Sequence, residues 1–186
     1  MALHRVLTFA QALMKEHIQK GDTVIDGTCG NGSDTAFLAR LVGSEGKVYG
    51  FDIQEQAIEK TEKKLLEKNL LDRVACIQDG HENIAKWIKE PVNAAMFNLG
   101  YLPGSDKKIT TQANTTIKAI ADLLSLLSPG GIVTIIVYTG HDQGSEGMRI
   151  EEYVQSLSQK ELNVLKYQFI NQKHHPPYLI AIEKNK

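Results

Sequence analysis

The chain reads Asp26-Gly27-Thr28-Cys29-Gly30-Asn31-Gly32-Ser33-Asp34 between a short apolar run and a helical pattern. Small residues at such a junction let the backbone turn sharply and approach a ligand closely, and the following helix presents unpaired N–H groups to that ligand. A dinucleotide-binding loop would read Gly-x-Gly-x-x-Gly, whereas the glycines here are Gly27, Gly30 and Gly32. The segment therefore predicts a Rossmann-like α/β fold with a nucleotide-like cofactor, and its spacing argues against an NAD-dependent dehydrogenase.

On both sides of this segment, β-rich runs alternate with helical patterns, which is typical of strand-helix-strand units and a mostly parallel sheet. The expected strands are residues 23–26, 47–52, 74–78, 93–98, 132–138, 164–170 and 178–182. The expected helices are residues 6–17, 34–42, 55–69, 82–88, 112–127 and 146–159. Ser128-Pro129-Gly130-Gly131 should end the fifth of these helices. The last two strands are joined by too short a segment for a crossover helix, so they should pair antiparallel.

These elements predict one α/β domain over residues 1–186, with a leading helix in 1–20 and a core in 21–186. Its sheet should be seven-stranded and mostly parallel, with an antiparallel C-terminal strand. A chain of 186 residues, 42% hydrophobic and 23% charged, is typical of a globular domain. It has neither an apolar run long enough to span a bilayer nor the pattern of a signal peptide, so we expect a cytoplasmic protein without a membrane partner. Cys29 and Cys76 lie in no Cys/His cluster, which predicts neither disulfides nor a metal site.

Acidic residues recur at the ends of the first three predicted strands, as Asp26, Asp52 and Asp79. The carboxyl ends of parallel strands meet at one edge of a sheet, so we expect these three acids to line one site. An acid at the position of Asp52 can accept hydrogen bonds from both hydroxyls of a ribose. Features far apart in the sequence thus point to a single ligand site.

With Asp26 ending the strand and glycines four and six residues later, the first loop resembles the Asp-x-Gly-x-Gly-x-Gly motif of class I S-adenosylmethionine-dependent methyltransferases. Thr28 stands where that family usually has its first glycine, so its backbone must avoid positive φ or the turn is shifted to Gly27. The resemblance implies S-adenosylmethionine as cofactor and an adenine contact at Asp79, although Asp79 would equally suit a helix N-cap. The cofactor-binding residues expected on this basis are Asp26, Gly27, Thr28, Gly30, Asn31, Gly32, Asp34, Thr35, Asp52, Gln54, Asp79, His81, Asn98 and Gly100.

The fourth predicted strand runs into Asn98-Leu99-Gly100-Tyr101-Leu102-Pro103-Gly104. This segment resembles a variant of the Asn/Asp-Pro-Pro-Tyr motif of class I methyltransferases that act on amino nitrogens. The Asn98 carboxamide oxygen can accept hydrogen bonds from an amine and aim its lone pair at the methyl group, while Tyr101 can stack on the substrate. The alternative is a strand-end asparagine with a core tyrosine in a Pro-Gly turn. His141, after the fifth strand, is a third catalytic candidate as proton acceptor or substrate clamp, or an ordinary loop histidine.

Over nearly the whole chain, these motifs together with Tyr138-Thr139-Gly140-His141 and the closing Asn171-Gln172 resemble a small bacterial family named rRNA methylases. Its members look like the tRNA methyltransferase that converts wobble 5-aminomethyl-2-thiouridine to its methylaminomethyl form. The resemblance implies an aliphatic amine as acceptor, the tRNA anticodon stem-loop as partner, and a homodimer.

The charge balance of the chain limits how it can hold RNA. Twenty-one Lys and Arg residues against 22 Asp and Glu residues give a net charge of −1, so an RNA would need a local basic patch. The substrate-binding candidates are Arg5, Tyr101, Lys107, Lys108 and His141. The alternative, which any single basic cluster favours when taken alone, is an ordinary solvated surface. Fold and cofactor do not fix the acceptor. Open alternatives are methylation of rRNA or of a small-molecule amine, and a catalytically silent S-adenosylmethionine-binding subunit.

Overall fold

The computed structural model describes residues 3–100, 111–138, 144–173 and 176–186. The helices are α1 (Val6–His17), α2 (Ser33–Val42), α3 (Glu55–Glu67), α4 (Ile84–Trp87), α5 (Ala113–Leu126) and α6 (Ser145–Gln155), with short 3₁₀ turns η1 (Leu71–Arg73) and η2 (His81–Asn83). The strands are β1 (Thr23–Asp26), β2 (Lys47–Asp52), β3 (Val74–Gln78), β4 (Val92–Asn98), β5 (Leu127–Val137), β6 (Leu162–Tyr167) and β7 (Tyr178–Lys184).

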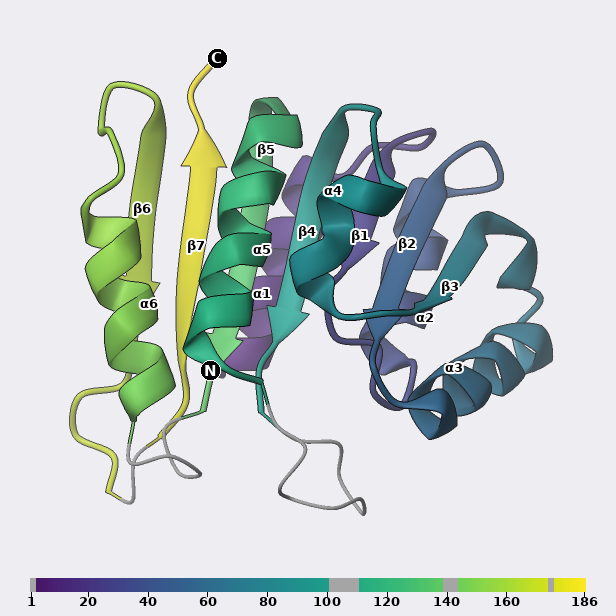
Figure 1. Cartoon of the computed structure of the whole chain (residues 1–186), viewed down its shortest axis with the longest axis horizontal. Coiled ribbons are helices and arrows are strands. Elements are labelled where there is room, and N and C mark those ends of the chain that lie inside the picture. The colour runs from purple at the N-terminus through teal and green to yellow at the C-terminus, as the bar shows by residue number, and fades with distance from the viewer. Residues whose placement is uncertain (1–2, 101–110, 139–143, 174–175) are drawn as a thin grey trace.

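The strands form one seven-stranded sheet in the order β3-β2-β1-β4-β5-β7-β6. The five strands from β3 to β5 in this order pair in parallel, and β7 lies antiparallel between β5 and β6 (Figure 1). The predicted α/β sheet with its antiparallel C-terminal strand is therefore confirmed. The order reverses direction between β1 and β4, which is where ligands bind in open sheets of this kind.

Successive side chains of the central strands point to opposite faces of the sheet and belong to two apolar cores, one on each face. In β4, Phe97 packs with α4, α5 and α6, whereas its neighbour Met96 packs with α1, α2 and α3. Figure 1 shows α4, α5 and α6 in front of the sheet, with α1 and α2 behind it. Both faces are covered, which explains why the strands read as nearly continuous apolar runs rather than as alternating ones.

The Pro-Gly-Gly segment differs from the prediction in one respect. Helix α5 ends before it, as expected, but β5 already begins at Leu127 instead of residue 132. Leu127 pairs with Val92, and the next register pair is Ile132 with Ala94, so residues 128–131 are accommodated as a bulge. Gly130 adopts φ of +77° there, a conformation that costs glycine little. The same residues thus end a helix and start a bulged strand.

Several other predicted elements have different bounds, and the helix expected over residues 146–159 already ends at Gln155. The helix expected over residues 82–88 is divided into η2 and α4. The strand expected over 164–170 runs from Leu162 to Tyr167, because its pairing with β7 sets its register. Element ends depend on such tertiary contacts more than on local sequence.

Candidate active site at the carboxyl edge of the sheet

The loop after β1 is held by the carboxylate of Asp26, which is fully buried. One Asp26 oxygen accepts from the backbone N–H of Thr28 at 3.0 Å and the other from the hydroxyl of Thr35 at 2.6 Å. Gly30 and Gly32 take φ of +55° and +74°, which the turn into α2 requires. The loop is thus fixed at both ends before any ligand binds.

Thr28 avoids the positive φ that a glycine in its place would favour, since among the described residues only Asn69 and glycines have positive φ. Its hydroxyl accepts a hydrogen bond from the backbone N–H of Asn98 at 2.8 Å, which ties the loop to the end of β4. At Gly27, a Cβ atom would overlap the ring of Phe97. The departure from the family motif therefore adds a cross-link, while Gly27 lets the loop approach β4.

Asp52, at the end of β2, lies beside this loop and is partly exposed. Its two oxygens accept from the backbone N–H groups of Gly30 and Gln54, each at 3.0 Å. A carboxylate oxygen can accept more than one hydrogen bond, so both oxygens keep capacity for a ligand. Asn31 accepts from the N–H of Ser33 at 3.2 Å and helps to start α2.

The end of β4 meets α2 and α1 at a second acid, Asp34. The Asn98 carboxamide donates to one oxygen of Asp34 at 3.3 Å, and the Gln11 carboxamide donates to the other at 3.4 Å. Burial raises the pKa of Asp34, and these two hydrogen bonds partly oppose that rise. Burial and the neighbouring charge of Asp34 raise the pKa of Asp26 to about 7. An edge with Asp26, Asp34 and Asp52 favours ligands that carry positive charge or donate hydrogen bonds.

Asp79 and His81, in the turn that follows β3, already have hydrogen-bond partners within the protein. The exposed carboxylate of Asp79 accepts from Gly80 N–H, from Asn83 Nδ2 and from Trp87 Nε1, at 2.7 to 2.8 Å. These bonds, led by that from Trp87, lower the pKa of Asp79. Its adenine contact stays a prediction, as does the cofactor role of His81.

His81 lies behind the loop after β1 and is buried. Its Nδ1 is 3.2 Å from the carbonyl oxygen of Gly27, and its ring packs edge-on against Phe97 at 5.7 Å between centroids. Burial lowers the pKa of His81, which keeps the imidazole neutral near pH 7. From this place it supports the loop from beneath.

A buried chain of hydrogen bonds, which the sequence did not reveal, continues from His81 to the loop after β4. Thr116 Oγ1 lies 3.5 Å from His81 Nε2 and donates to Glu146 at 3.0 Å. Glu146 also accepts from Thr111 Oγ1 at 2.8 Å, and Thr111 in turn accepts from the N–H of Gly100 at 3.0 Å. The only sequence signal is a threonine within the apolar stripe of α5. This chain connects the two loops expected to bind cofactor and substrate.

Several predicted site residues are not seen at this edge. Tyr101, Lys107, Lys108 and His141 lie outside the described residues. Arg5 is exposed at the start of α1, two turns before Gln11. Their roles stay predictions. Gln11 itself is a site residue that sequence reasoning missed, because nothing in α1 marks it as a partner of Asp34.

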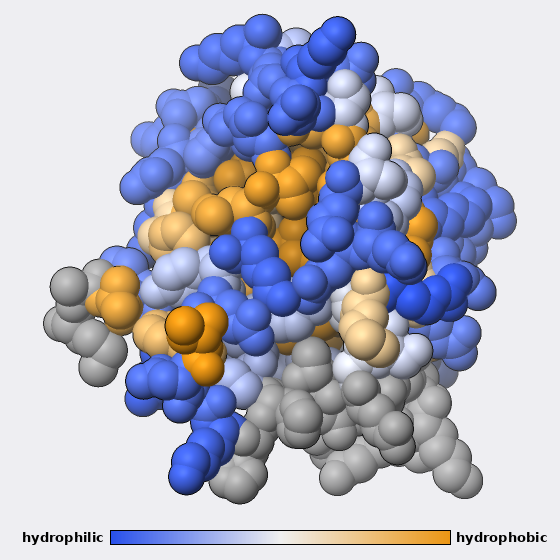
Figure 2. Space-filling view, turned by 90° about the vertical axis from the view of Figure 1, so that its left-hand side faces the viewer, coloured by the Kyte–Doolittle hydropathy of each residue, from blue (hydrophilic) through white to orange (hydrophobic). Residues whose placement is uncertain are grey.

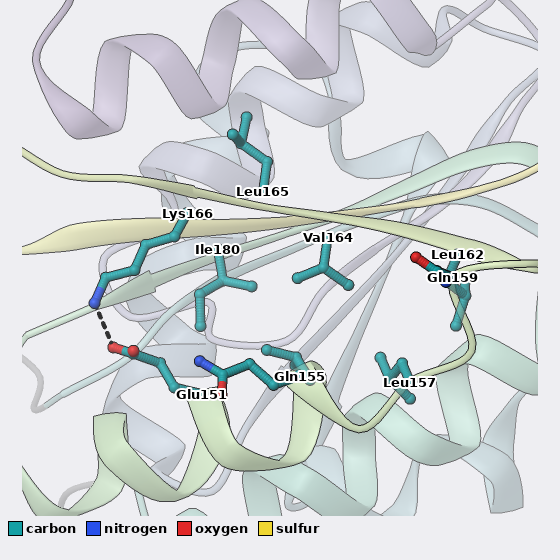
Figure 3. A pocket seen from close by; sticks show the side chains of 10 residues that line it. Glu151, Gln155, Leu157, Gln159, Leu162, Val164, Leu165, Lys166 and Ile180 are labelled. Carbon is teal, nitrogen blue, oxygen red and sulfur yellow. Dashed lines mark hydrogen bonds and ion pairs between the residues drawn. The ribbon is translucent and has the colours of Figure 1, made fainter.

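The described residues form neither a metal site nor a membrane-spanning helix. Within the described residues, no group of three or more His, Cys, Asp or Glu side chains is arranged to hold a metal ion. The helices in that part of the chain include none that is both long and apolar enough to cross a membrane. Away from the carboxyl edge, a groove of about 370 Å³ lies between α6 and β6 and has Val164 and Ile180 among its lining (Figures 2 and 3).

The sheet order, the acidic strand ends and the Gly-rich loop define a class I methyltransferase. Within that class, the chain belongs to the family described as "Putative rRNA methylase", which it matches over residues 48–183. The predicted family is therefore confirmed.

Individual relatives agree with this assignment. A chloroplastic tRNA (mnm5s2U34)-methyltransferase of Arabidopsis thaliana is 36% identical over 173 residues, which cover 87% of this chain and 63% of that protein. This chain thus spans less than two thirds of that relative. A solved rRNA-methylase homologue from Clostridium thermocellum is 48% identical with a TM-score of 0.97, covering 99% of this chain and 100% of its own. A methyltransferase homologue from Streptococcus mutans, solved in complex with S-adenosylhomocysteine, is 41% identical with a TM-score of 0.90, covering 98% and 99%.

Proposed function

We propose that this chain is a cytoplasmic enzyme that transfers a methyl group from S-adenosylmethionine to the aminomethyl nitrogen of wobble 5-aminomethyl-2-thiouridine in tRNA. The product is 5-methylaminomethyl-2-thiouridine. The observation that carries the proposal is the hydrogen bond from Asn98 to Asp34 at 3.3 Å beside the Gly-rich loop, because an amide next to a carboxylate is suited to orienting an amine. The plant relative named for this nucleoside and the homologue with bound S-adenosylhomocysteine support it.

The residues present fit the cofactor. Asp52 would accept from the ribose hydroxyls with the capacity left after its bonds to Gly30 and Gln54. The loop from Gly27 to Gly32 would lie against the methionine part, where small residues leave room for a close approach. Asp79, already fixed by three donors, would face the adenine with its remaining lone pairs.

When bound, S-adenosylmethionine supplies an electrophilic methyl group on a sulfonium, which leaves as a neutral thioether and needs no acid. The protein has two tasks, which are to orient the amine and to keep its lone pair free. The Asn98 carboxamide oxygen does the first, because its N–H side is turned to Asp34. Proximity and orientation then supply most of the rate enhancement. The negative edge suits both the sulfonium and an incoming ammonium group.

The substrate is tested by nucleoside mass spectrometry of tRNA from a strain that lacks the gene. We expect 5-aminomethyl-2-thiouridine to accumulate and the purified chain to methylate it with labelled S-adenosylmethionine. If the wobble nucleosides are unchanged and the label appears in rRNA or in a small amine, the proposed tRNA substrate is wrong. The methyltransferase activity would then stand with a different acceptor. No transfer to any of these would indicate a silent binding subunit.

The cofactor site is tested by calorimetry with S-adenosylhomocysteine. Asp52→Ala should weaken binding at least tenfold, because it removes the acceptor for the ribose hydroxyls. Asp72→Ala is the matched control, since Asp72 is an exposed acid whose nearest charged partner is Arg73. Equal affinities of the two variants would contradict the assignment of Asp52.

We also propose that the anticodon stem-loop is bound in part by Lys107 and Lys108. The net charge of −1 means that local basic residues must supply the attraction to phosphates. Replacing both with Glu should weaken tRNA binding at least tenfold and leave S-adenosylhomocysteine binding unchanged. Unaltered tRNA affinity would remove this pair from the RNA surface.

A homodimer is the remaining part of the proposal, and the edge strand β6 supports it. Val164 and Leu165 in β6 are 40% and 48% exposed, and Figure 2 shows an apolar hollow on this side of the molecule. Long apolar edge strands are usually covered, because exposed ones promote aggregation. Sedimentation should show a dimer that Leu165→Glu dissociates, whereas a monomer in both cases would contradict the proposal.

A further inference from the structure

Three of the acids at the carboxyl edge, Asp26, Asp34 and Asp52, are used differently. Asp26 and Asp52 each accept a backbone N–H of the loops around β1 and β2, at 3.0 Å. Asp34, in the first turn of α2, accepts within the described residues only from the side-chain amides of Asn98 and Gln11, at 3.3 and 3.4 Å. Asp34 therefore contributes little to the loop and is available for another task.

We propose that Asp34 accepts the proton that the substrate ammonium group must lose before methyl transfer. This inference rests on the proposed function, because only an aliphatic amine is protonated near neutral pH and needs such a step. Asp34 would thereby be a catalytic base rather than a ligand of the cofactor.

The geometry around Asn98 places the amine near Asp34. An ionised carboxylate can only accept hydrogen bonds, so the amide edge that faces Asp34 must be the NH₂ group. The other edge, Oδ1, is then the acceptor that orients the amine. Both groups belong to one planar carboxamide whose NH₂ edge contacts Asp34, so a nitrogen bound at Oδ1 would be separated from the Asp34 carboxylate by the width of that carboxamide. A single side chain thus links the base to the acceptor atom.

The surroundings of Asp34 make it a better proton acceptor than an exposed aspartate. Burial, with 9% of the residue exposed, raises its pKa. The hydrogen bonds from Asn98 on β4 and Gln11 on α1, together with the positive charge of Lys64 on α3, act in the opposite direction. Burial raises the pKa of Asp26 at the end of β1 and of Tyr138 after β5, and the charge of Asp34 adds to both rises. Burial is the largest of these influences, so the Asp34 carboxylate is a stronger base than an exposed aspartate.

The other titratable groups of the described site are less suited. Asp26 is 1% exposed, and both of its oxygens are held within the loop. His81 is buried behind the loop with partners at both ring nitrogens. Asp52, at the end of β2, accepts from the N–H groups of Gly30 and Gln54 and is assigned to the ribose. Asp34 is the acid that remains beside Asn98.

The step balances without another reactant. The ammonium group transfers one proton to the Asp34 carboxylate, which becomes a neutral acid, and the amine regains its lone pair. The nitrogen then attacks the methyl carbon while the carbon–sulfur bond breaks toward sulfur. The product nitrogen is a secondary ammonium, and Asp34 returns its proton to solvent after release.

The test is the pH dependence of transfer to tRNA isolated from the strain that lacks the gene. Asp34→Asn should lower kcat at pH 7 by about 100-fold or more, in the range of a general base. Without a base, the rate follows the fraction of neutral amine, so the deficit should shrink by about tenfold per pH unit toward pH 9. S-adenosylhomocysteine affinity, measured by calorimetry, should stay within twofold of the unaltered chain.

Two control variants separate this role from others. Asp52→Asn should weaken S-adenosylhomocysteine binding at least tenfold, yet at saturating S-adenosylmethionine its pH profile should match that of the unaltered chain. Asp72→Asn should change neither quantity. Thermal unfolding checks that Asp34→Asn is folded, and Asp34→Ser, which suits a helix start, is the second variant if it is not.

Each remaining outcome is decisive. A loss in Asp34→Asn that is equal at every pH and accompanied by weakened S-adenosylhomocysteine binding would make Asp34 a cofactor ligand and overturn the inference. An unchanged rate would do the same. Transfer by neither the variant nor the unaltered chain would overturn the proposed substrate, and the need for a base would go with it.

Discussion

The carboxyl edge beside β1 and the far end of the sheet at β6 are built on opposite principles. At the first, buried acids such as Asp26 and Asp34 hold donors from three or more elements. At the second, an open groove of about 370 Å³ is lined mainly by aliphatic side chains, with one ion pair, between Lys166 and Glu151, at its rim (Figure 3). The apolar hollow is thus not where the polar chemistry is concentrated.

The difference shows which kind of side chain fixes the position of reactive groups in this fold. Buried polar groups are costly unless they are fully paired, so a site built from them is fixed by many simultaneous hydrogen bonds. An apolar groove on an edge strand has no such requirement, and it tolerates side chains that remain exposed. We therefore expect substitutions at the edge to affect both folding and ligand binding, and those at the groove to affect folding alone or very little.

The largest effect is expected for Gly32→Ala. Gly32 has φ of +74°, and a Cβ there would lie 2.8 Å from the Cα of Thr61 in α3. Backbone strain and forced movement of α3, in which Thr61 is buried, should together lower the free energy of unfolding by about 2 to 5 kcal/mol. Urea unfolding and S-adenosylhomocysteine calorimetry measure both consequences.

Gly21→Ala is the matched control for that variant. Gly21 has φ of +91°, but a Cβ there would meet nothing within 4 Å. Only the strain of about 1 to 2 kcal/mol should remain, with ligand affinity intact. Equal losses in the two variants would show that α3 does not constrain the loop.

The second effect concerns the floor and the rim of the groove. Ile180 in β7 is 1% exposed, so Ile180→Ala should destabilise the protein by about 2 to 3 kcal/mol. Val164 in β6 is 40% exposed, so Val164→Ala should cost less than ~1 kcal/mol. Neither should alter S-adenosylhomocysteine binding, and a binding loss in either would break the separation between the two regions.

Most of the fold followed from the sequence because hydrophobic periodicity and turn residues are local signals. The antiparallel pairing of the last two strands followed from their short connection, whereas the order of the strands in the sheet is known only from the structure. Local signals did not give the register of β5, where residues 128–131 bulge between the pairs Leu127–Val92 and Ile132–Ala94. Pairing with a neighbouring strand decided that point.

The site, too, has features that the sequence predicted and contacts that it did not. The acids Asp26 and Asp52 at strand ends were predictable, since parallel strands bring their carboxyl ends together. The contacts of Gln11 and Asn98 with Asp34 were not, because they join side chains of three elements 23 and 64 residues apart. Whether a side chain faces a ligand or supports another loop, as His81 supports the loop after β1, depends on packing that sequence spacing does not show.

The third prediction is a pH dependence of stability that originates at the carboxyl edge. Burial and the charge of Asp34 raise the pKa of Asp26 to about 7, whereas an unfolded aspartate titrates near 4. The folded state therefore holds a proton that the unfolded state has lost. The stability that this provides is complete below about pH 4 and is lost as pH rises to about 7, with a slope of at most ~1.4 kcal/mol per pH unit.

Asp26→Asn tests this directly, because the amide keeps the shape of the side chain and removes its titration. Urea unfolding between pH 5 and pH 8 should show the unaltered chain losing stability relative to the variant. Parallel profiles for the two proteins would show that Asp26 stays ionised in the fold.

The smallest effect is expected for the ion pair at the rim of the groove. Lys166 Nζ lies 2.7 Å from Glu151, and the two side chains are 40% and 25% exposed. Because water screens such a pair, a double-mutant cycle with Lys166→Met and Glu151→Gln should give a coupling of about 0.2 to 1 kcal/mol that decreases with added salt. Lys166 also lies 4.4 Å from the centre of the Tyr178 ring, so Lys166→Met alone should cost more than Glu151→Gln. A coupling well above ~1 kcal/mol would mean that the groove rim is as tightly organised as the carboxyl edge, and the contrast between the two regions would then disappear.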